Sequence, residues 1–405
     1  MNKKPITKLS IFNLLKKIKK NKIGNEEVIL IDATNRILAK DIKSKINLPP
    51  FNNSAVDGYA IHKRDLYKAQ KLLSTQRIAA GDKLPIDLKK GEVARIFTGA
   101  CMPANCKTVI MQENVTAKDK HILINKIPTY GENCRLAGED IAKGSKVLSQ
   151  GNKINATNIN LIAAIGKQRV VVKKKLKIGY YVSGNELKKP SERLHGSQIN
   201  NSNHYSLHAL LDHAYLESRY LGILRDSKKF IIDSILRNTN KFDVLITTGG
   251  ASVGEEDHLI QTIQKLGKIF FWKAAIKPGR PLAVGKIKNT FMICLPGNPV
   301  SVHLLYGMIV KPFLEFLCGA PLIQPRGIKA TAMFSMKKKN QRMEWLRVNI
   351  IKNSENLSVN RYYKQGSGMI SSMVFTDGIL EIPENISYIS RGDRFIFYSF
   401  KELFN

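Results

Sequence analysis

The stretch of this sequence most suited to chemistry consists of small residues followed by acids. An apolar strand predicted at 244–248 ends in Gly249 and Gly250, and a second turn of small residues leads to three successive acids at 255–257. Glycines at the end of a buried strand let backbone N–H groups approach an anion. Carboxylates just beyond them can hold a divalent cation. The pattern therefore predicts a phosphate-bearing ligand at the edge of an α/β sheet.

A stiff basic loop is the second candidate. Lys273, Lys277 and Arg280 lie within eight positions and are framed by prolines and a glycine. Cations fixed in such a loop form a preorganised oxyanion site. Further on, a strand predicted at 290–295 turns into a helix through the prolines and the asparagine of 296–299. The free N–H groups of that helix would face the strand ends, although a plain tight connection is the alternative.

Four polar residues at turns or strand ends are weaker signals alone. Asp57 lies in a loop of small and amide residues and could be only a turn former. Thr98 ends a predicted strand and could donate a hydrogen bond to an oxyanion. Arg135 could form a planar fork around a phosphate or pair with an acid of its own turn. Glu186 follows a predicted parallel strand, at the carboxyl end where ligands bind.

The elements that must position these residues fall into distinct regions. Short strands punctuated by glycines predict a small β-rich domain over 51–140. Strands alternate with helices from 176 to 319, which indicates parallel βαβ units with right-handed crossovers. Beyond Pro321 the chain reads as strands again and predicts a small barrel. An amphipathic helix is predicted over 9–23.

Composition bounds the class of protein. With 405 residues and 43% hydrophobic residues, the chain can build two to four domains. The N-terminus mixes lysines into its apolar positions and does not read as a signal peptide, and apolar runs such as 304–310 are too short to span a bilayer. A cytoplasmic protein without a membrane segment is expected. The odd number of cysteines, without any CxxC, favours reduced thiols over zinc or disulfides.

The net charge of +33 suggests nucleic-acid binding, but the distribution of charge argues against it. Lysines are spread over the whole chain, and aromatic residues do not interleave with the basic runs as a stacking platform requires. No specific nucleic-acid partner is expected. The sequence contains no P-loop, HExxH or GxSxG motif, so the remaining inventory suits oxyanion or phosphoryl chemistry by positioning and charge.

Taken together, these segments resemble the MoeA family of molybdopterin molybdenumtransferases, which is related to the C-terminal domain of gephyrin. Each motif is weak alone, but the ordered set is highly specific. The matching segments are 48–60, 95–103, 131–141, 182–187, 246–258, 275–285 and 295–302.

The resemblance implies a multidomain α/β plus β fold. Residues 1–48 and 142–175 would form an elongated discontinuous N-terminal domain, and 49–141 an inserted β-rich domain. Residues 176–320 would form a molybdopterin-binding-type α/β domain, and 321–405 a C-terminal β-barrel. An elongated homodimer is implied, with the site between the α/β domain of one subunit and the β-rich and barrel parts near its partner. Other proteins of molybdenum cofactor synthesis are open as partners.

The activity implied is insertion of molybdenum, as molybdate, into adenylyl-molybdopterin, with release of AMP and with Mg²⁺ assistance. Position by position, the resemblance implies catalytic roles for Asp57, Thr98, Glu186, Asp226, Asp257, Lys273 and Lys277. It implies Mg²⁺ ligands at Glu186, Asp226 and Asp257. It implies substrate-binding roles for Arg135, Asp140, Ser183, Gly249, Gly250, Ser252, Arg280, Pro296, Pro299, Arg347 and Ser367.

Four departures from the family pattern remove acids. Asn52, Asn185, Asn201 and Ser227 stand where the family usually has carboxylates. Losing them could weaken a metal site, or it could be drift in a sequence rich in lysine and asparagine. The first reading leads to an alternative function, a catalytically weakened molybdopterin-binding scaffold.

Overall fold

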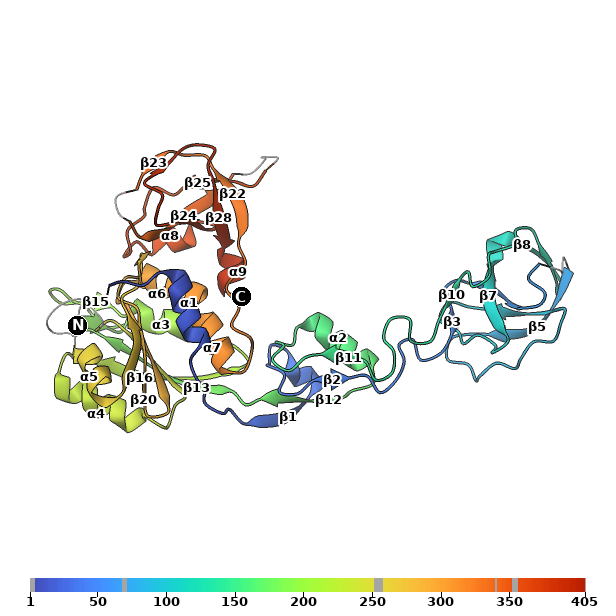
Figure 1. The fold of residues 1–405 in the computed structure, drawn as a ribbon, viewed down its shortest axis with the longest axis horizontal. Coiled ribbons are helices and arrows are strands. Elements are labelled where there is room, and N and C mark those ends of the chain that lie inside the picture. The colour runs from blue at the N-terminus through green and yellow to red at the C-terminus, as the bar shows by residue number, and fades with distance from the viewer. Residues whose placement is uncertain (1–3, 68–70, 251–257, 339–340, 352–355, 405) are drawn as a thin grey trace.

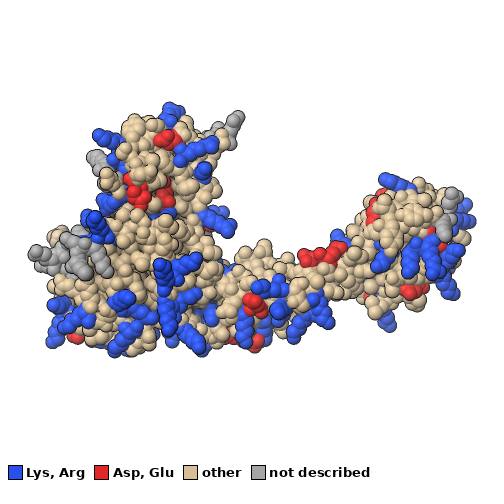
Figure 2. All heavy atoms as spheres, in the orientation of Figure 1, with Lys and Arg blue, Asp and Glu red and all other residues tan. Residues whose placement is uncertain are grey.

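The structure is a computed structural model that describes residues 4–67, 71–250, 258–338, 341–351 and 356–404. The chain is elongated, with a large body at one end, a narrow middle and a small β-rich domain at the other end (Figure 1). The body contains an α/β domain with a β-barrel stacked on it. Lys and Arg are distributed along the whole visible face rather than gathered on one element (Figure 2).

The α/β domain is built on a six-stranded mixed sheet. Its first four strands are parallel, as the sequence predicts, whereas the last two are antiparallel and were not predicted. The order is β16 (Leu216–Leu224), β13 (Leu176–Ser183), β17 (Val244–Thr248), β21 (Thr290–Leu295), β20 (Ala283–Ile287) and β18 (Lys268–Trp272).

Helices cover both faces of this sheet. On one face, α4 (Lys228–Asn238) and α5 (His258–Leu266) bury their apolar sides against alternate residues of β17 and β21. The other face is covered by α3 (Ser202–Leu210), and by α6 (Pro299–Leu305), which continues through a π-helical turn into α7 (Lys311–Leu317).

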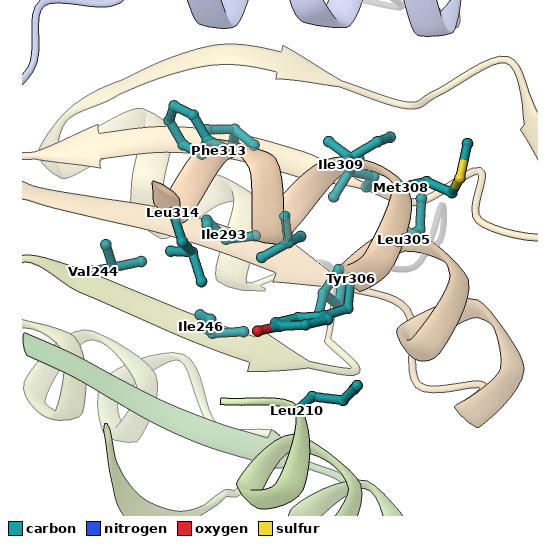
Figure 3. Packing of buried hydrophobic residues seen from close by; sticks show 14 of the residues in the cluster. Leu210, Val244, Ile246, Ile293, Leu305, Tyr306, Met308, Ile309, Phe313 and Leu314 are labelled. Atoms are coloured by element: carbon teal, nitrogen blue, oxygen red, sulfur yellow. The ribbon is translucent and has the colours of Figure 1, made fainter. Parts of the chain in front are cut away.

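The α6–α7 helix forms the centre of the largest core. Figure 3 shows Tyr306, Phe313 and Leu314 facing Ile246 and Ile293 of the sheet. The run Pro299–Leu317 is long and apolar enough to cross a membrane by length and composition, which is longer than the apolar runs considered in the sequence. However, 89% of this apolar stretch is buried inside the protein, as expected for a core helix.

The N-terminal helix α1 (Lys8–Lys16) is shorter than the predicted amphipathic helix and packs on the body. Its apolar residues Ile11, Phe12 and Leu15 belong to the core of the α/β domain. This packing differs from the expected grouping of 1–48 with the middle domain, because the spacing of apolar residues shows an amphipathic face but not its partner. The domain boundaries otherwise stay a prediction.

The narrow middle of the molecule consists of two antiparallel ribbons with a helix beside them (Figure 1). Its apolar residues form a small separate core. Its elements are β1 (Asn25–Ile29) paired with β12 (Arg169–Lys173), β2 (Ile42–Lys43) paired with β11 (Lys146–Leu148), the 3₁₀ helix Leu30–Ala33, and α2 (Ala156–Ala164).

The inserted domain is β-rich, as predicted, and carries its own cores. A six-stranded sheet runs in the order β7 (Cys106–Met111), β4 (Gly58–His62), β6 (Glu92–Ile96), β5 (Lys71–Ile78), β9 (His121–Ile124) and β8 (Val115–Lys118). A short ribbon pairs β3 (Asn53–Ser54) with β10 (Cys134–Arg135), and the 3₁₀ helix Gln112–Asn114 follows β7.

The C-terminal region is a closed barrel, which confirms the sequence prediction. It closes because one strand, β24, pairs with both β25 and β26. The strands are β24 (Met343–Ile350), β25 (Ser358–Arg361), β22 (Ile328–Ala332), β28 (Arg394–Ser399) and β26 (Gly378–Ile382). Smaller elements are β23 (Met336–Lys337) paired with β27 (Tyr388–Ile389), α8 (Ser371–Val374) and α9 (Phe400–Phe404).

The barrel and the α/β domain share a sheet. The short strand β19 (Ile276–Lys277), which belongs to the α/β domain by sequence, pairs in parallel with β24. The amide of Met343 donates to the carbonyl of Ala275 at 3.0 Å. This pairing places the basic loop, which contains β19, against the barrel.

Candidate active site

A polar cleft of about 720 Å³ lies at the carboxyl edge of the parallel sheet. The four parallel strands end side by side there, so residues far apart in sequence meet at one edge. The barrel contributes Gly368 and Ile370 to the rim. Of the residues expected in the site, the cleft is lined by Ser183, Glu186, Asp226, Gly249, Gly250, Pro296 and Pro299.

The acidic side of the cleft is formed by the loops after β13 and β16. Ser183 Oγ lies 3.2 Å from the carbonyl of Leu224 and 3.4 Å from Asp226 Oδ1, so the hydroxyl ties the two strand ends together. Glu186 and Asp226 are both exposed to solvent. They are the carboxylates that the described residues offer at this edge.

Glycines let the backbone come close at the floor of the cleft. Gly249 has φ +82°, and a Cβ there would lie 2.7 Å from the carbonyl oxygen of Ser183. Gly184 has φ +147°, and a Cβ there would lie within 2.7 Å of the Glu186 carboxylate oxygens. The positive φ disfavours a side chain at both positions. At Gly249 a Cβ would also clash with backbone, whereas at Gly184 it would meet only the movable end of the exposed Glu186 side chain.

The N-terminus of α3 forms a further wall that the sequence analysis did not assign. The side chain of Asn201 caps α3 by accepting from the amide of His204 at 3.1 Å. Asn203 is buried and donates from Nδ2 to the carbonyl of Gly297 at 2.7 Å. Asn201 is one of the positions where the family usually has an acid, and an amide performs the capping role there equally well.

A second compartment of about 460 Å³ adjoins the cleft and is strongly cationic. The two share Pro281, Pro296 and Asn298, so they are contiguous. The second compartment lies between the basic loop after β19 and the barrel. The expected site residues that line it are Lys277, Arg280, Pro296, Arg347 and Ser367, and Arg342 lines it as well.

Arg347 reaches this compartment from a buried position in β24. Its guanidinium donates to Ser372 Oγ at 3.2 Å and to the carbonyls of Trp345 at 3.2 Å and Gly366 at 3.3 Å. Burial lowers the pKa of Arg347 to about 10, with Glu344 opposing this shift. The guanidinium therefore remains charged at neutral pH, and its partners are neutral oxygens rather than carboxylates.

Lys277 is the cation of this compartment that has an acidic partner. Its Nζ donates to Glu344 Oε1 at 2.7 Å across the β19–β24 pairing. Lys273, by contrast, lines neither compartment. It has φ +72°, is largely buried, and places Nζ 4.2 Å from the centroid of the Trp272 ring. The structure thus separates two lysines that the sequence analysis treated alike.

Asp57 and Thr98 lie together in the β-rich domain, at the far end of the chain from the cleft (Figure 1). Asp57 Oδ1 accepts from the backbone amide and from the hydroxyl of Thr98, both at 2.8 Å. The hydrogen bond from the Thr98 amide, followed by that from its hydroxyl, lowers the pKa of Asp57. The carboxylate is therefore held ionised and oriented, but one chain does not bring it to the α/β cleft.

The remaining expected residues are separated from the cleft or lie outside the described residues. Arg135 is exposed in β10, and Asp140 is exposed where the β-rich domain joins the middle ribbons, with its amide bonded to Leu48. Ser252 and Asp257 lie outside the described residues. Within the described ranges, no cluster of three or more metal-ligating side chains occurs.

These observations define the class of protein. A parallel sheet carries a polar cleft with glycine turns at its carboxyl edge, and a cationic compartment sits beside it under a barrel. Such a pair of compartments can hold an anionic small molecule, with its most strongly charged group in the cationic compartment and the rest in the cleft. The class is a multidomain α/β plus β protein with a polar cleft and an adjoining cationic compartment.

Three family comparisons cover most of the chain. Residues 9–166 match the MoeA N-terminal region (domain I and II). Residues 180–315 match the family described as "Probable molybdopterin binding domain". Residues 329–400 match the MoeA C-terminal region (domain IV).

Relatives agree with these matches. The chain is 34% identical over 381 residues to a molybdopterin molybdenumtransferase of Haemophilus influenzae, covering 93% of this chain and 94% of that one. It is 30% identical over 398 residues to that of a Nostoc species, covering 94% and 90%. Among solved structures, a molybdopterin biosynthesis MoeA protein from Pyrococcus horikoshii matches with a TM-score of 0.81 and 28% identity, covering 98% of this chain and 100% of the other.

The chain belongs to the MoeA family. Membership makes it an enzyme with a role in molybdenum cofactor biosynthesis. The sequence resemblance to this family and the multidomain fold class that it implied are thereby confirmed.

Proposed function

We propose that this protein inserts molybdenum into adenylyl-molybdopterin, using molybdate and releasing AMP. The observation that carries the proposal is the contiguity of an acid-bearing, glycine-floored cleft with a cationic compartment. Adenylyl-molybdopterin carries a pterin and a pyrophosphate, whereas molybdate is a compact dianion. Two adjoining compartments of unlike charge can hold these two substrates next to each other, so that positioning lowers the barrier to exchange.

Each compartment has a distinct role in this proposal. Gly250 brings its backbone N–H to the phosphates at the sheet edge, whereas Gly249, whose amide donates to the carbonyl of Leu295 at 3.0 Å, shapes the turn. Lys277, Arg280 and Arg347 neutralise molybdate and the charge that develops as AMP leaves. The cleft carboxylates Glu186 and Asp226 would hold a divalent cation and orient the substrate.

The described residues of the cleft could hold Mg²⁺ only together with ligands from the substrate. Mg²⁺ is commonly held by one or two carboxylates together with substrate phosphates rather than by a full protein cage. Glu186 and Asp226 can supply those carboxylates, and Asp257 is a third candidate outside the described residues. When bound, Mg²⁺ would supply neutralisation of the pyrophosphate.

Purified protein given adenylyl-molybdopterin, molybdate and Mg²⁺ should release AMP in a molybdate-dependent manner. Asp226→Asn should slow release by about 100-fold or more, because a charged group in the site is lost. The matched control is Asp233→Asn, an exposed carboxylate on α4 of the same domain, which should behave as the wild type. Binding of the substrate without any molybdate-dependent AMP release would instead favour the scaffold alternative.

We further propose a homodimer in which Asp57 and Thr98 of one subunit complete the cleft of the other. The support is that the β-rich domain, which carries these two residues, lies at the opposite end of the elongated molecule from the α/β domain (Figure 1). In a two-fold symmetric dimer, an elongated chain can reach its partner's site with its far end.

Subunit mixing tests this arrangement. Asp57→Ala and Asp226→Ala should each be inactive alone. Co-expression of the two should restore about a quarter of wild-type activity, because half of the dimers are mixed and each mixed dimer has one intact shared site. No recovery in dimers shown to be mixed would mean that the site does not form between subunits.

A further inference from the structure

Arg342 lines the cationic compartment but lies outside the sequence motifs that indicated its other cations. It directly precedes β24 and lines the compartment together with Arg280. Burial and the nearby charge of Arg280 lower the pKa of Arg342, while Glu344 acts in the opposite direction. The two guanidinium groups are therefore close enough to repel each other electrostatically, although they come from different domains.

The compartment holds more positive than negative charge. Four cations line it, Lys277, Arg280, Arg342 and Arg347, against the single lining carboxylate Glu344. That carboxylate is hydrogen-bonded to Lys277 at 2.7 Å. Within the described residues, none of the three arginines forms an ion pair.

Arg280 and Arg342 also have donors to spare. In the part of the chain that the structure describes, neither side chain donates a hydrogen bond to another protein group, whereas Arg347 is anchored by three. A guanidinium that served only to hold the barrel in place would be expected to bond to that barrel. Arg280 is exposed and Arg342 half-buried, so solvent screens part of their repulsion, and an anion bound between them removes the rest.

We propose that Arg342 and Arg280 form a guanidinium clamp that selects doubly charged tetrahedral oxyanions, with Arg342 as a specificity-determining residue. This inference rests on the proposed function for the identity of the natural anion, molybdate. Each guanidinium can present two parallel N–H groups to two oxygens of one tetrahedral ion. A singly charged ion of the same shape compensates less of the compartment's positive charge than a dianion does, and it binds more weakly.

Direct binding to the full-length protein tests the clamp without turnover. Isothermal titration calorimetry with sodium molybdate, at fixed ionic strength and without pterin or Mg²⁺, should detect binding to the wild type. Sulfate, a dianion, should compete, and perchlorate, a tetrahedral monoanion, should not. Arg342→Gln should weaken molybdate binding by about 10- to 100-fold, as expected for a lost charged hydrogen-bonding partner. Arg342→Lys, which keeps the charge but not the fork, should lie between.

The matched control is Arg394→Gln, an exposed arginine on β28 of the same barrel, which should bind molybdate within about twofold of the wild type. Thermal unfolding by circular dichroism checks that each variant is folded, and Arg342→Lys carries the test if the glutamine variant is not. Unchanged molybdate binding by folded Arg342 variants would overturn the clamp. So would equal competition by sulfate and perchlorate, or no molybdate binding to the wild type.

The clamp and the proposed function fail in different ways. Arg342-dependent molybdate binding without AMP release would leave the clamp in place and remove the proposed reaction. Molybdate-dependent AMP release with binding that does not depend on Arg342 would do the reverse.

Discussion

Replacing Lys8 should uncouple the N-terminal helix from the barrel. Lys8 lies on α1, which packs on the α/β core, yet its Nζ lies 2.6 Å from both carboxylate oxygens of Glu381 on β26. Both side chains are about nine-tenths buried. The same carboxylate accepts from Trp345 Nε1 at 2.9 Å and lies 3.5 Å from the Tyr398 hydroxyl. Burial and Glu381 raise the pKa of Tyr398, so its hydroxyl stays protonated as a donor.

The size of the effect follows from what remains after the amine is removed. Lys8→Met keeps most of the apolar stem but leaves the carboxylate of Glu381 buried without a cation, and breaking a buried pair costs about 3–5 kcal/mol. Trp345 and Tyr398 still donate to Glu381, so we expect the lower end, about 3 kcal/mol. Adding Glu381→Gln removes the stranded charge and should recover about 1–2 kcal/mol. Lys16→Met, an exposed position on the same helix, should cost less than about 0.5 kcal/mol.

Urea unfolding followed by tryptophan fluorescence measures these differences. The chain has two tryptophans, so a Trp272→Phe background leaves Trp345, whose indole touches the pair, as the reporter. The reasoning is refuted if Lys8→Met unfolds within about 0.5 kcal/mol of its parent. It is also refuted if the double variant is no more stable than Lys8→Met, because the cost would then not come from the stranded carboxylate.

Two further predictions concern a site glycine and a buried histidine. Gly249→Ala should destabilise the protein by about 1–3 kcal/mol more than Gly144→Ala in thermal or urea unfolding. Both glycines have φ above +80°, but of the two only Gly249 would place a Cβ against a backbone oxygen. Equal losses of stability in the two variants would contradict the predicted clash. Burial, followed by Lys311 and Lys153, lowers the pKa of His213 to about 4 against the opposing charges of Glu315 and Asp212, so the unfolded chain binds the proton first as pH falls. Stability should therefore drop between about pH 6.5 and pH 4, by about 1–2 kcal/mol after allowing for partial exposure, and His213→Gln should flatten this drop in urea titrations at each pH; an equally steep drop in the variant would assign it to other groups.

Sequence patterns predicted the parallel part of the sheet well because burial on both faces makes those strands continuous apolar runs. The strands 244–248 and 290–295 have the predicted bounds. The antiparallel strands β18 and β20 were missed because they directly flank the basic loop, whose prolines and glycine dominated the reading of that stretch. The partner of α1 was missed because an amphipathic pattern does not say which surface it meets.

The candidate site shows the same division. Parallel topology predicts that the turns holding Ser183, Glu186 and Gly249 share one edge, and the family resemblance added Asp226. All four residues line one cleft. Arg342 could not be found this way, because it comes from another domain and reaches the compartment only through the docking of the barrel. The site roles of Asp57 and Thr98 in the β-rich domain stay predictions, because a single chain does not bring these residues to the cleft.

The strand shared between the α/β domain and the barrel has a mechanical consequence. Because β19 and β24 are joined by a backbone ladder and by Lys277–Glu344, the two domains cannot swing apart without breaking a sheet. The width of the cationic compartment is therefore fixed by hydrogen bonds rather than by a hinge. We expect ligands to enter and leave through its open mouth, and a proteolytic cut in the connection 321–327 to nick the chain without releasing the barrel.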